Sequence, residues 1–352
     1  MKVYLKFQDG TKIEGLSFGY EKSVGGEIAF STSMMGYPES LTDPSYKGQI
    51  LTLSYPIVGS YGIPKKELWE SKKIQVSGLI VSHYIDTPSH FQSTQTLGEW
   101  LKKEQIPALE IPDTRLIVKK IRDEGAALVK IEFGETIDFI DPNRENLVEM
   151  VSTKEVKIYE PFAHLGGVQR RNKTVVLIDC GVKENIVREL LKRDIRVIKV
   201  PWDFDFIQKG IKCDGILISN GPGDPKMADK TIEIVKKALQ KKIPILGICL
   251  GNQILALASG GDTYKLPFGH RGQNQPCELV GTKKCYITTQ NHGFAIGRMP
   301  VGFKPWFINS NDKTNEGIIH NLLPFMSVQF HPEAAPGPVD TSWIFDYFLK
   351  TL

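Results

Sequence analysis

The sequence predicts an α+β N-terminal domain followed by an α/β doubly wound domain. Residues 1 to about 60 hold apolar runs typical of β-strands, separated by turn signals. From residue 174 onward, short apolar strands alternate with amphipathic helices, which is the pattern of a parallel sheet. A length of 352 residues also suggests two domains. The periodicity weakens around residues 150 to 172, so we place the domains at 1–170 and 171–352.

The N-terminal domain begins with a predicted β-hairpin. Its strands, 3–7 and 12–16, flank the turn signal Asp9-Gly10. A further strand at 27–31 leads into a polar, glycine-containing stretch, 32–48, whose Asp-Pro-Ser sequence predicts a turn. The remaining predicted elements are strands at 49–55, 76–82 and 127–131, and helices at 97–104 and 115–124. An Asp113-Thr114 cap and Gly125 bound the second helix.

The C-terminal domain is predicted as a series of βαβ units. Its expected strands are 174–179, 195–200, 215–219 and 243–248, and its helices are 185–192, 228–240, 252–259 and 343–349. The stretch between residues 260 and 342 is less regular. Sites in doubly wound sheets lie at the carboxyl ends of the strands. The segments 179–181 and 220–224, together with Cys249, are expected at that edge.

Cys249 lies at the centre of the sequence Gly247-Ile248-Cys249-Leu250-Gly251. This spacing is that of a nucleophile elbow, with sulfur in place of the serine oxygen. The glycines permit a strained strand-to-helix turn, and the following helix N-terminus favours a thiolate. The alternative is that Cys249 is a small core residue, as many free cysteines are.

A cysteine nucleophile also needs a base and oxyanion donors. His331 follows a predicted strand, and Glu333, two residues on, can orient its imidazole. The glycines of the 220–223 stretch can present backbone N–H groups at the same sheet edge, although the stretch lacks the ending of a Walker loop. Each segment taken alone is equally compatible with an ordinary turn.

The composition excludes several classes of protein. A net charge of +4 with interspersed signs argues against nucleic acid as the main partner. The N-terminus is too charged for a signal peptide, and no apolar run is long enough to span a bilayer. Five scattered cysteines indicate a reduced, cytoplasmic protein. The seven histidines show no metal-ligand spacing, so we expect no metal in this chain.

The motifs together resemble one family. The elbow followed by Asn252-Gln253, the Asn-Gly-Pro-Gly stretch at 220–223 and the His-Pro-Glu sequence at 331–333 resemble the class I (triad) glutamine amidotransferases. The segments 30–34, 36–37, 41–46, 112–115, 269–272, 290–294 and 332–338 resemble the small subunits of carbamoyl phosphate synthetases. This second resemblance covers essentially the whole chain.

The resemblance implies a catalytic triad in which Cys249 is the nucleophile, His331 the base and Glu333 the orienting acid. It also implies a set of glutamine-binding residues: Ser45, Gly221, Gly223, Leu250, Gln253, Asn291, Gly293 and Phe294. The sequence departs from the commonest family pattern at Asn252, where many relatives have His, at Gln275 and at Phe330. None of these departures removes a triad member.

A small subunit of this family is expected to hydrolyse L-glutamine and to deliver the ammonia to a large subunit. That partner would make carbamoyl phosphate from bicarbonate and ATP for arginine and pyrimidine synthesis. The resemblance implies a heterodimer or a higher oligomer, with the N-terminal domain as the docking surface. No cofactor is expected in this chain, because it lacks an ATP-binding signature; ATP and magnesium are expected on the large subunit.

Two other functions are compatible with parts of the sequence. The chain could serve anthranilate, guanylate or aminodeoxychorismate synthesis, but amidotransferases of those types lack the N-terminal 170 residues. It could also be a non-catalytic regulatory subunit of the same fold. The intact Cys249, His331 and Glu333 argue against that alternative.

Overall fold

A computed structural model describes residues 2–161 and 173–352. The chain forms two compact units, Met1–Glu145 and Asn146–Leu352. The domain boundary expected at residues 170 and 171 lies outside the described residues, and the division into compact units comes earlier. The reason is that β8 (Lys157–Tyr159) pairs antiparallel with β10 (Arg196–Pro201) of the second unit.

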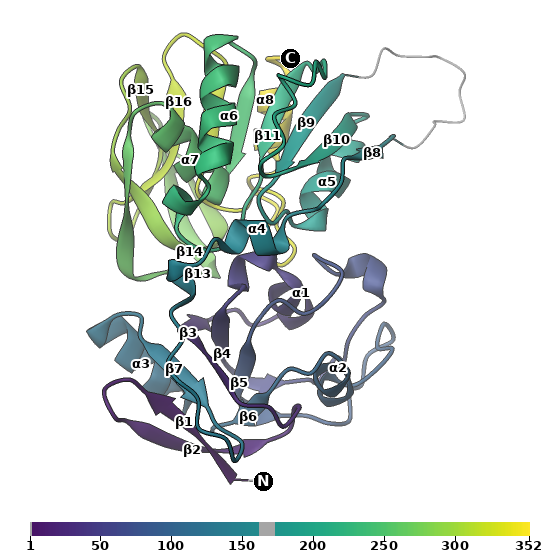
Figure 1. The fold of residues 1–352 in the computed structure, drawn as a ribbon, viewed down its shortest axis with the longest axis vertical. Coiled ribbons are helices and arrows are strands. Elements are labelled where there is room, and N and C mark those ends of the chain that lie inside the picture. Colours follow the sequence, from purple (N-terminus) through teal and green to yellow (C-terminus); the bar gives the residue numbers. More distant parts are fainter. Residues whose placement is uncertain (1, 162–172) are drawn as a thin grey trace. The chain divides into compact units, whose positions relative to one another are not determined.

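The first unit contains a closed barrel with the strand order β1-β2-β6-β5-β4-β3-β7 (Figure 1). Its strands are β1 (Lys2–Phe7), β2 (Lys12–Ser17), β3 (Val24–Ser31), β4 (Gln49–Val58), β5 (Gly78–Tyr84), β6 (Ala108–Glu110) and β7 (Leu128–Ile131). The predicted β1–β2 hairpin is antiparallel, whereas β3, β4, β5 and β6 pair in parallel. The mixture of barrel and helices confirms the expected α+β class.

Three helices accompany the barrel: α1 (Tyr37–Thr42), α2 (Leu97–Lys103) and α3 (Thr114–Glu124). The side chain of Asp113 caps α3, and α3 ends at Gly125, as the sequence predicts. Helix α1 lies in the stretch 32–48, where the sequence predicted no helix, and the turn expected from Asp-Pro-Ser follows it as the short 3-10 helix Pro44–Tyr46. Helix α1 is only six residues long and begins with Gly36 and a proline, so local sequence favours a turn over a helix.

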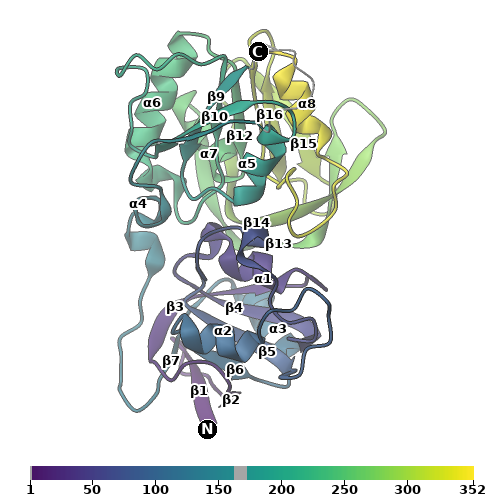
Figure 2. The ribbon, with the colours of Figure 1, turned by 90° about the vertical axis from the view of Figure 1, so that its right-hand side faces the viewer.

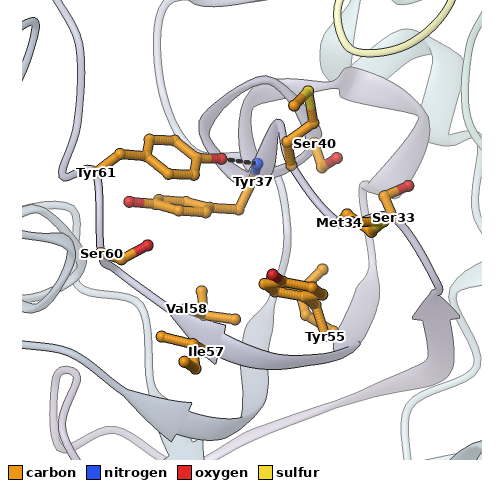
Figure 3. Close-up of a pocket in the computed structure, with 11 residues that line it drawn as sticks. Ser33, Met34, Tyr37, Ser40, Tyr55, Ile57, Val58, Ser60 and Tyr61 are labelled. Atoms are coloured by element: carbon orange, nitrogen blue, oxygen red, sulfur yellow. Dashed lines mark hydrogen bonds between the residues drawn. The ribbon is translucent and has the colours of Figure 1, made fainter. Parts of the chain in front are cut away.

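A tyrosine pair holds the start of α1 (Figure 3). The ring of Tyr61 stacks on that of Tyr37 with centroids 4.3 Å apart. The Tyr61 hydroxyl accepts hydrogen bonds from the N–H groups of Gly36 and Tyr37, at 2.7 and 3.0 Å. It therefore supplies the acceptor that no side-chain cap provides to this helix. The pair borders a pocket of about 250 Å³, into which Ile57 and Val58 also face.

The second unit is built on a ten-stranded sheet with the order β14-β13-β15-β16-β17-β12-β11-β9-β10-β8 (Figures 1 and 2). Besides β8 and β10, its strands are β9 (Thr174–Asp179), β11 (Gly215–Ile218), β12 (Ile245–Ile248), β13 (Asp262–Leu279), β14 (Cys285–Arg298), β15 (Phe303–Asn309), β16 (Asn315–His320) and β17 (Phe325–Val328). Five neighbouring strands, from β17 to β10, are parallel. This parallel core confirms the doubly wound prediction.

Helices cover both faces of the parallel core. They are α4 (Leu147–Val151), α5 (Glu184–Leu191), α6 (Asp229–Gln240), α7 (Leu250–Ala258) and α8 (Trp343–Leu349). Alternate residues of β9 point to opposite faces: Val175 packs in the core with α5 and α8, and Val176 packs in the core with α6 and α7. Strands buried on both faces are continuous apolar runs, which is why the sequence predicted them well.

The stretch between residues 260 and 342, which the sequence left irregular, contains an antiparallel extension of the sheet. Strands β13 and β14 pair along most of their length, with register shifts between Lys265 and His270 and between Gly272 and Gln275. Polar residues and glycines interrupt the alternation of apolar and polar residues from which such strands are predicted. Among the described residues, no helix combines the length and the apolar character needed to cross a membrane.

Candidate active site

Cys249 occupies a strained turn between β12 and α7. It is the N-cap of α7, and its φ of 55° and ψ of −104° are unusual for a residue with a side chain. Its N–H donates to the carbonyl of Val328 in β17 at 2.8 Å. Its thiol points to the carbonyl of Asn291, with the sulfur 3.8 Å from that oxygen. The elbow conformation expected from the sequence is therefore present.

The two glycines around Cys249 are required by close backbone contacts. A Cβ on Gly247 would lie 2.4 Å from the carbonyl oxygen of Gly251. A Cβ on Gly251 would lie 2.2 Å from the carbonyl oxygen of Ile218, in the neighbouring strand β11. The spacing of the motif thus comes from the approach of strand and helix backbones.

His331 reaches Cys249 because β12 and β17 are adjacent and parallel. Ile248 pairs with Val328, so the residues that follow the two strands emerge at the same sheet edge. The backbone N–H of His331 donates to the carbonyl of Thr289 at 2.9 Å. Its Nδ1 lies 2.6 Å from Oε1 of Glu333. That hydrogen bond fixes the ring so that Nε2 remains for proton transfer.

The triad is buried, and its charges act on one another. Burial alone would lower the pKa of His331, but the charges of Glu333 and Cys249 outweigh it and raise that pKa. Among the described residues, Nε2 of His331 makes no hydrogen bond within ordinary distance limits. In general, a protonated imidazole close to a cysteine favours the thiolate, which is the nucleophilic form.

Lys183 supports Glu333 and was not found from the sequence. Its Nζ lies 3.2 Å from Oε1 of Glu333, and both side chains are almost fully buried. Burial raises the pKa of Glu333, but the charges of Lys183 and His331 outweigh it and lower that pKa. Nζ also donates to the carbonyl of Ala334 at 2.5 Å, and Asn185 donates to that of Glu333. The one sequence signal for this pairing with Glu333 is the position of Lys183, four residues after the end of β9 at the predicted sheet edge.

The seven expected glutamine-binding residues of the second unit are placed as follows. Gly221 lies against Leu250, since a Cβ there would come within 2.8 Å of the leucine side chain. Nε2 of Gln253 donates to the carbonyl of Phe294 at 2.8 Å, and Asn291 contacts the thiol of Cys249 as described.

The other two are glycines. Gly223 has a φ of 81° and lies beside Leu147 of α4, and Gly293 lies beside Gly269 and Arg271. The structure thus links Leu250 and Asn291 directly to the elbow, and Gln253 to the neighbouring Phe294, whereas Gly223 and Gly293 lie beside other residues.

Ser45 belongs to the first unit. It is buried in the short 3-10 helix Pro44–Tyr46, and its N–H donates to Oδ1 of Asp43 at 2.9 Å. This contact is the Asx turn expected from the Asp-Pro-Ser sequence. The role of Ser45 toward glutamine remains a prediction.

The three departures from the family pattern have clear positions. The buried Asn252 donates to Oε1 of Gln329 and accepts from the hydroxyl of Ser327, at 3.0 and 2.8 Å. Phe330 is fully buried and meets the ring of Phe307 edge-on. The backbone carbonyl of Gln275 accepts the hydroxyl of Thr288 at 2.8 Å. Asn252 and Phe330 are thus accommodated in the interior of the second unit.

A second cluster of ionisable groups lies between β13, β14 and β16. The ligand-type atoms of His270, His292 and Glu316 all lie within 4.8 Å of one another. His270 already pairs with two carboxylates: Nδ1 lies 3.0 Å from Oε1 of Glu316, and Nε2 lies 2.7 Å from Oδ2 of Asp312. These contacts form an ion-pair network around His270. The expected absence of a metal stays a prediction.

Comparison with known families agrees with this geometry. Residues 176–351 match the family described as glutamine amidotransferase class-I. Residues 5–131 match the family described as carbamoyl-phosphate synthase small chain, CPSase domain.

Similar proteins are longer than this chain. A human protein named carbamoyl-phosphate synthase [ammonia], mitochondrial, is 47% identical over 364 residues, which cover 99% of this chain and 24% of that protein. The multifunctional protein URA2 of Saccharomyces cerevisiae is 44% identical over 388 residues, covering 99% of this chain and 17% of that protein. The chain therefore spans about a quarter or less of the length of these relatives.

Among solved structures, one described as a glutamine amidotransferase from Thermotoga maritima is 20% identical. The likeness covers 51% of this chain and 84% of that one, with a TM-score of 0.37. That score is too low to support an argument. The two family matches rest on the sequence, and they place the elbow and the His-Pro-Glu segment inside the amidotransferase part. The chain thus belongs to the class I glutamine amidotransferases, with an N-terminal CPSase domain of the carbamoyl-phosphate synthase small chain.

Proposed function

We propose that this chain is the glutamine-hydrolysing part of a glutamine-dependent carbamoyl-phosphate synthase. The observation that carries the proposal is the arrangement of Cys249, His331 and Glu333 at one sheet edge. Cys249 lies in a strained elbow, and His331 is held by Glu333 at 2.6 Å. A merely structural fold would not require a buried lysine, glutamate and histidine in a row beside a strained cysteine.

The chemistry follows from these positions. The thiolate of Cys249 attacks the side-chain amide carbon of glutamine, and the negative charge moves to the amide oxygen. Backbone N–H groups of Gly223 and Leu250 are the proposed donors to that oxygen, because Leu250 opens helix α7. The imidazolium of His331 gives its proton to the departing nitrogen, and ammonia leaves with a glutamyl thioester behind.

His331 then takes a proton from water, and the resulting hydroxide attacks the thioester carbon. Glutamate leaves, and the sulfur of Cys249 returns to the thiolate with a protonated His331 beside it. Glu333 stays ionised throughout, because Lys183 and His331 lower its pKa. Its role is to hold the ring orientation and to stabilise the imidazolium.

The remaining residues of the proposed site bind the substrate. Ser45, Gly221, Gln253, Asn291, Gly293 and Phe294 are proposed to hold glutamine. Gln253 and Asn291 supply side-chain amides for the charged groups of the amino acid, and the glycines supply backbone N–H groups. No cofactor or metal takes part in this proposal.

Ammonia in bulk water is protonated and lost as a nucleophile, so the proposal requires a synthase partner that receives it through a shielded path. The relatives carry this region within much longer polypeptides, which supports such a partner. ATP and magnesium are proposed to act there, in a heterodimer or a higher assembly. The five cysteines of this chain are unpaired, which favours a reducing compartment such as the cytoplasm.

The use of glutamine rather than free ammonia is the sharper part of the proposal. One human relative is named for ammonia, so similarity alone does not choose between the two nitrogen sources. The complete Cys249–His331–Glu333 arrangement favours glutamine. The match of residues 5–131 to the small-chain domain disfavours the amidotransferases of other pathways.

The test is a Cys249→Ser variant assembled with the synthase partner. We expect loss of glutamine-dependent carbamoyl phosphate synthesis by at least about a thousandfold, with ammonia-dependent synthesis retained. Unchanged glutamine use would refute the proposal. A wild-type complex that uses ammonia and never glutamine would indicate a non-catalytic regulatory chain instead.

A further inference from the structure

A chain of buried amide hydrogen bonds lies behind the nucleophile elbow. Asn252 and Gln253 belong to the first turns of α7, and Gln329 directly follows β17, two residues before His331. Oε1 of Gln329 accepts from Nδ2 of Asn252 at 3.0 Å and from Nε2 of Gln253 at 3.1 Å. The hydroxyl of Ser327 donates to Oδ1 of Asn252 at 2.8 Å. All four side chains are at most 2% exposed.

The hydrogen-bond partners of Gln253 determine which end of its side-chain amide is nitrogen and which is oxygen. Nε2 of Gln253 also donates to the backbone carbonyl of Phe294 at 2.8 Å. A backbone carbonyl only accepts hydrogen bonds, so the nitrogen end of the Gln253 amide must face Phe294. Gln329 takes the second N–H of the same nitrogen. Both donors of the Gln253 amide are thereby used, and only its oxygen is left to bind a ligand.

An amide oxygen that can only accept selects a donor on the ligand. The α-ammonium group is the one positively charged hydrogen-bond donor of glutamine, so it is the strongest donor available to this oxygen. Were the amide of Gln253 free to turn over, its N–H groups would instead favour a carboxylate. The orientation set jointly by the Phe294 carbonyl and Gln329 therefore decides which end of the amino acid Gln253 recognises.

Gln329 is itself held from several sides. Its backbone N–H donates to the carbonyl of Glu316 at 2.9 Å, and Asn252 occupies the other approach to its oxygen. Its own Nε2 is buried without a partner among the described residues. The unpaired Nε2 lowers the stability of the fold, whereas Oε1 of the same side chain accepts hydrogen bonds from two amides.

Resting on the proposed function, we propose that Gln329 is a positioning residue that, together with the backbone carbonyl of Phe294, fixes the Gln253 carboxamide with its oxygen toward the α-ammonium group of glutamine. Gln329 does not touch the substrate in this proposal. It acts through Gln253, and its effect is on substrate affinity and on discrimination against compounds without an α-ammonium group.

The experiment compares Gln329→Leu, which removes the acceptor, with Gln329→Glu, which keeps an acceptor oxygen in the same place. Both are assayed in the complex with the synthase partner. The substrates are glutamine and glutaramate, the same amide without the α-ammonium group. Ser327→Ala is the matched control, because it removes a buried hydrogen bond of the same network without changing the contacts of Gln253.

We expect Gln329→Leu to raise KM for glutamine by about tenfold or more, with kcat changed by less than about threefold. Its activity toward glutaramate should stay near that of the wild type, so the preference for glutamine falls by the same factor. Gln329→Glu should recover most of that preference. Ser327→Ala should retain it, and ammonia-dependent synthesis should remain intact in every variant.

Two results would overturn the inference: an unchanged KM for glutamine in Gln329→Leu, or an equal loss toward glutamine and glutaramate. The second would mean that Gln329 only maintains the fold. If Gln329→Leu does not fold, a Gln329→Glu variant that loses the preference overturns the inference as well. A wild-type complex that hydrolyses no glutamine rejects the proposed function itself, which separates the two failures.

Discussion

At the scale of single residues, the charged groups at Cys249 extend beyond the three expected residues, because Lys183 pairs with Glu333. Lys183 Nζ and His331 Nδ1 both lie close to Oε1 of Glu333, at 3.2 and 2.6 Å. In a buried site an unpaired charge is costly, so each charged group keeps its neighbour ionised. His331 is thus held both in orientation and in protonation state before any substrate binds.

Replacing Lys183 by Met tests this pairing. The change leaves Glu333 buried, with His331 as its one cationic partner among residues 2–161 and 173–352, so we expect a loss of about 3 kcal/mol in the free energy of unfolding. Urea unfolding of the purified chain measures it. Lys192→Met is the control: this lysine pairs with Glu189 but its side chain is 64% exposed. Its loss should be about 0.5 kcal/mol or less. Equal losses in the two variants would show that the buried pair has no special weight.

At the scale of elements, the elbow is decided by how closely α7 approaches β11 and β12. Gly251→Ala places a Cβ 2.2 Å from a backbone oxygen that cannot move without shifting β11. We expect it to destabilise the second unit by about 2 kcal/mol or more and to lower glutamine hydrolysis sharply. Thermal unfolding measures the first effect.

The control for that substitution is Gly293→Ala. Within the part of the chain that the structure describes, a Cβ there meets the end of the Arg271 side chain alone, at an ordinary 3.6 Å. Its thermal unfolding should stay within about 1 kcal/mol of the wild type. A Gly251→Ala protein as stable as the Gly293→Ala protein would contradict the close approach.

The β13–β16 region should make stability depend on pH. Burial lowers the pKa of His270, but Glu316 and Asp312 outweigh it and raise that pKa above the ordinary 6.5. The neighbouring His292 has its pKa lowered by burial and stays neutral. A raised folded-state pKa gives stability that is complete below the ordinary value and is lost as the pH rises through the raised one.

We therefore expect the wild type to lose more stability between about pH 6 and about pH 9 than a His270→Gln variant, which cannot carry the charge. Urea midpoints at both pH values provide the measurement. A loss of the same size in the two proteins would rule out His270 as the source.

At the scale of the whole molecule, the second unit has two apolar cores of its own, one on each face of the sheet. We expect a fragment of residues 146–352 to fold alone and to unfold cooperatively, as circular dichroism during heating would show. A fragment without a cooperative transition would mean that the first unit is needed for folding.

Much of this architecture was available from the sequence alone. Strands β9 and β12 and helices α3, α6 and α8 were predicted to within a few residues, because burial on both faces and clear caps leave local signatures. Helix α1, β6 and the antiparallel strands after residue 260 were not. They are short, or are interrupted by polar residues and glycines, and their strands are stabilised by partners distant in the sequence.

The sequence by itself determined the elbow at Cys249, since its glycine spacing is a local backbone requirement, and it marked His331 and Glu333 as its partners. Only the tertiary structure decided that Lys183 stands behind Glu333 and that Gln329 faces Gln253. Lys183 and Glu333 are separated by 150 positions in the chain, and Gln253 and Gln329 by 76. No local sequence pattern encodes such contacts. The physical reason is that pairing between buried polar groups depends on which strand ends meet at the sheet edge, and that is set by the packing of the entire unit.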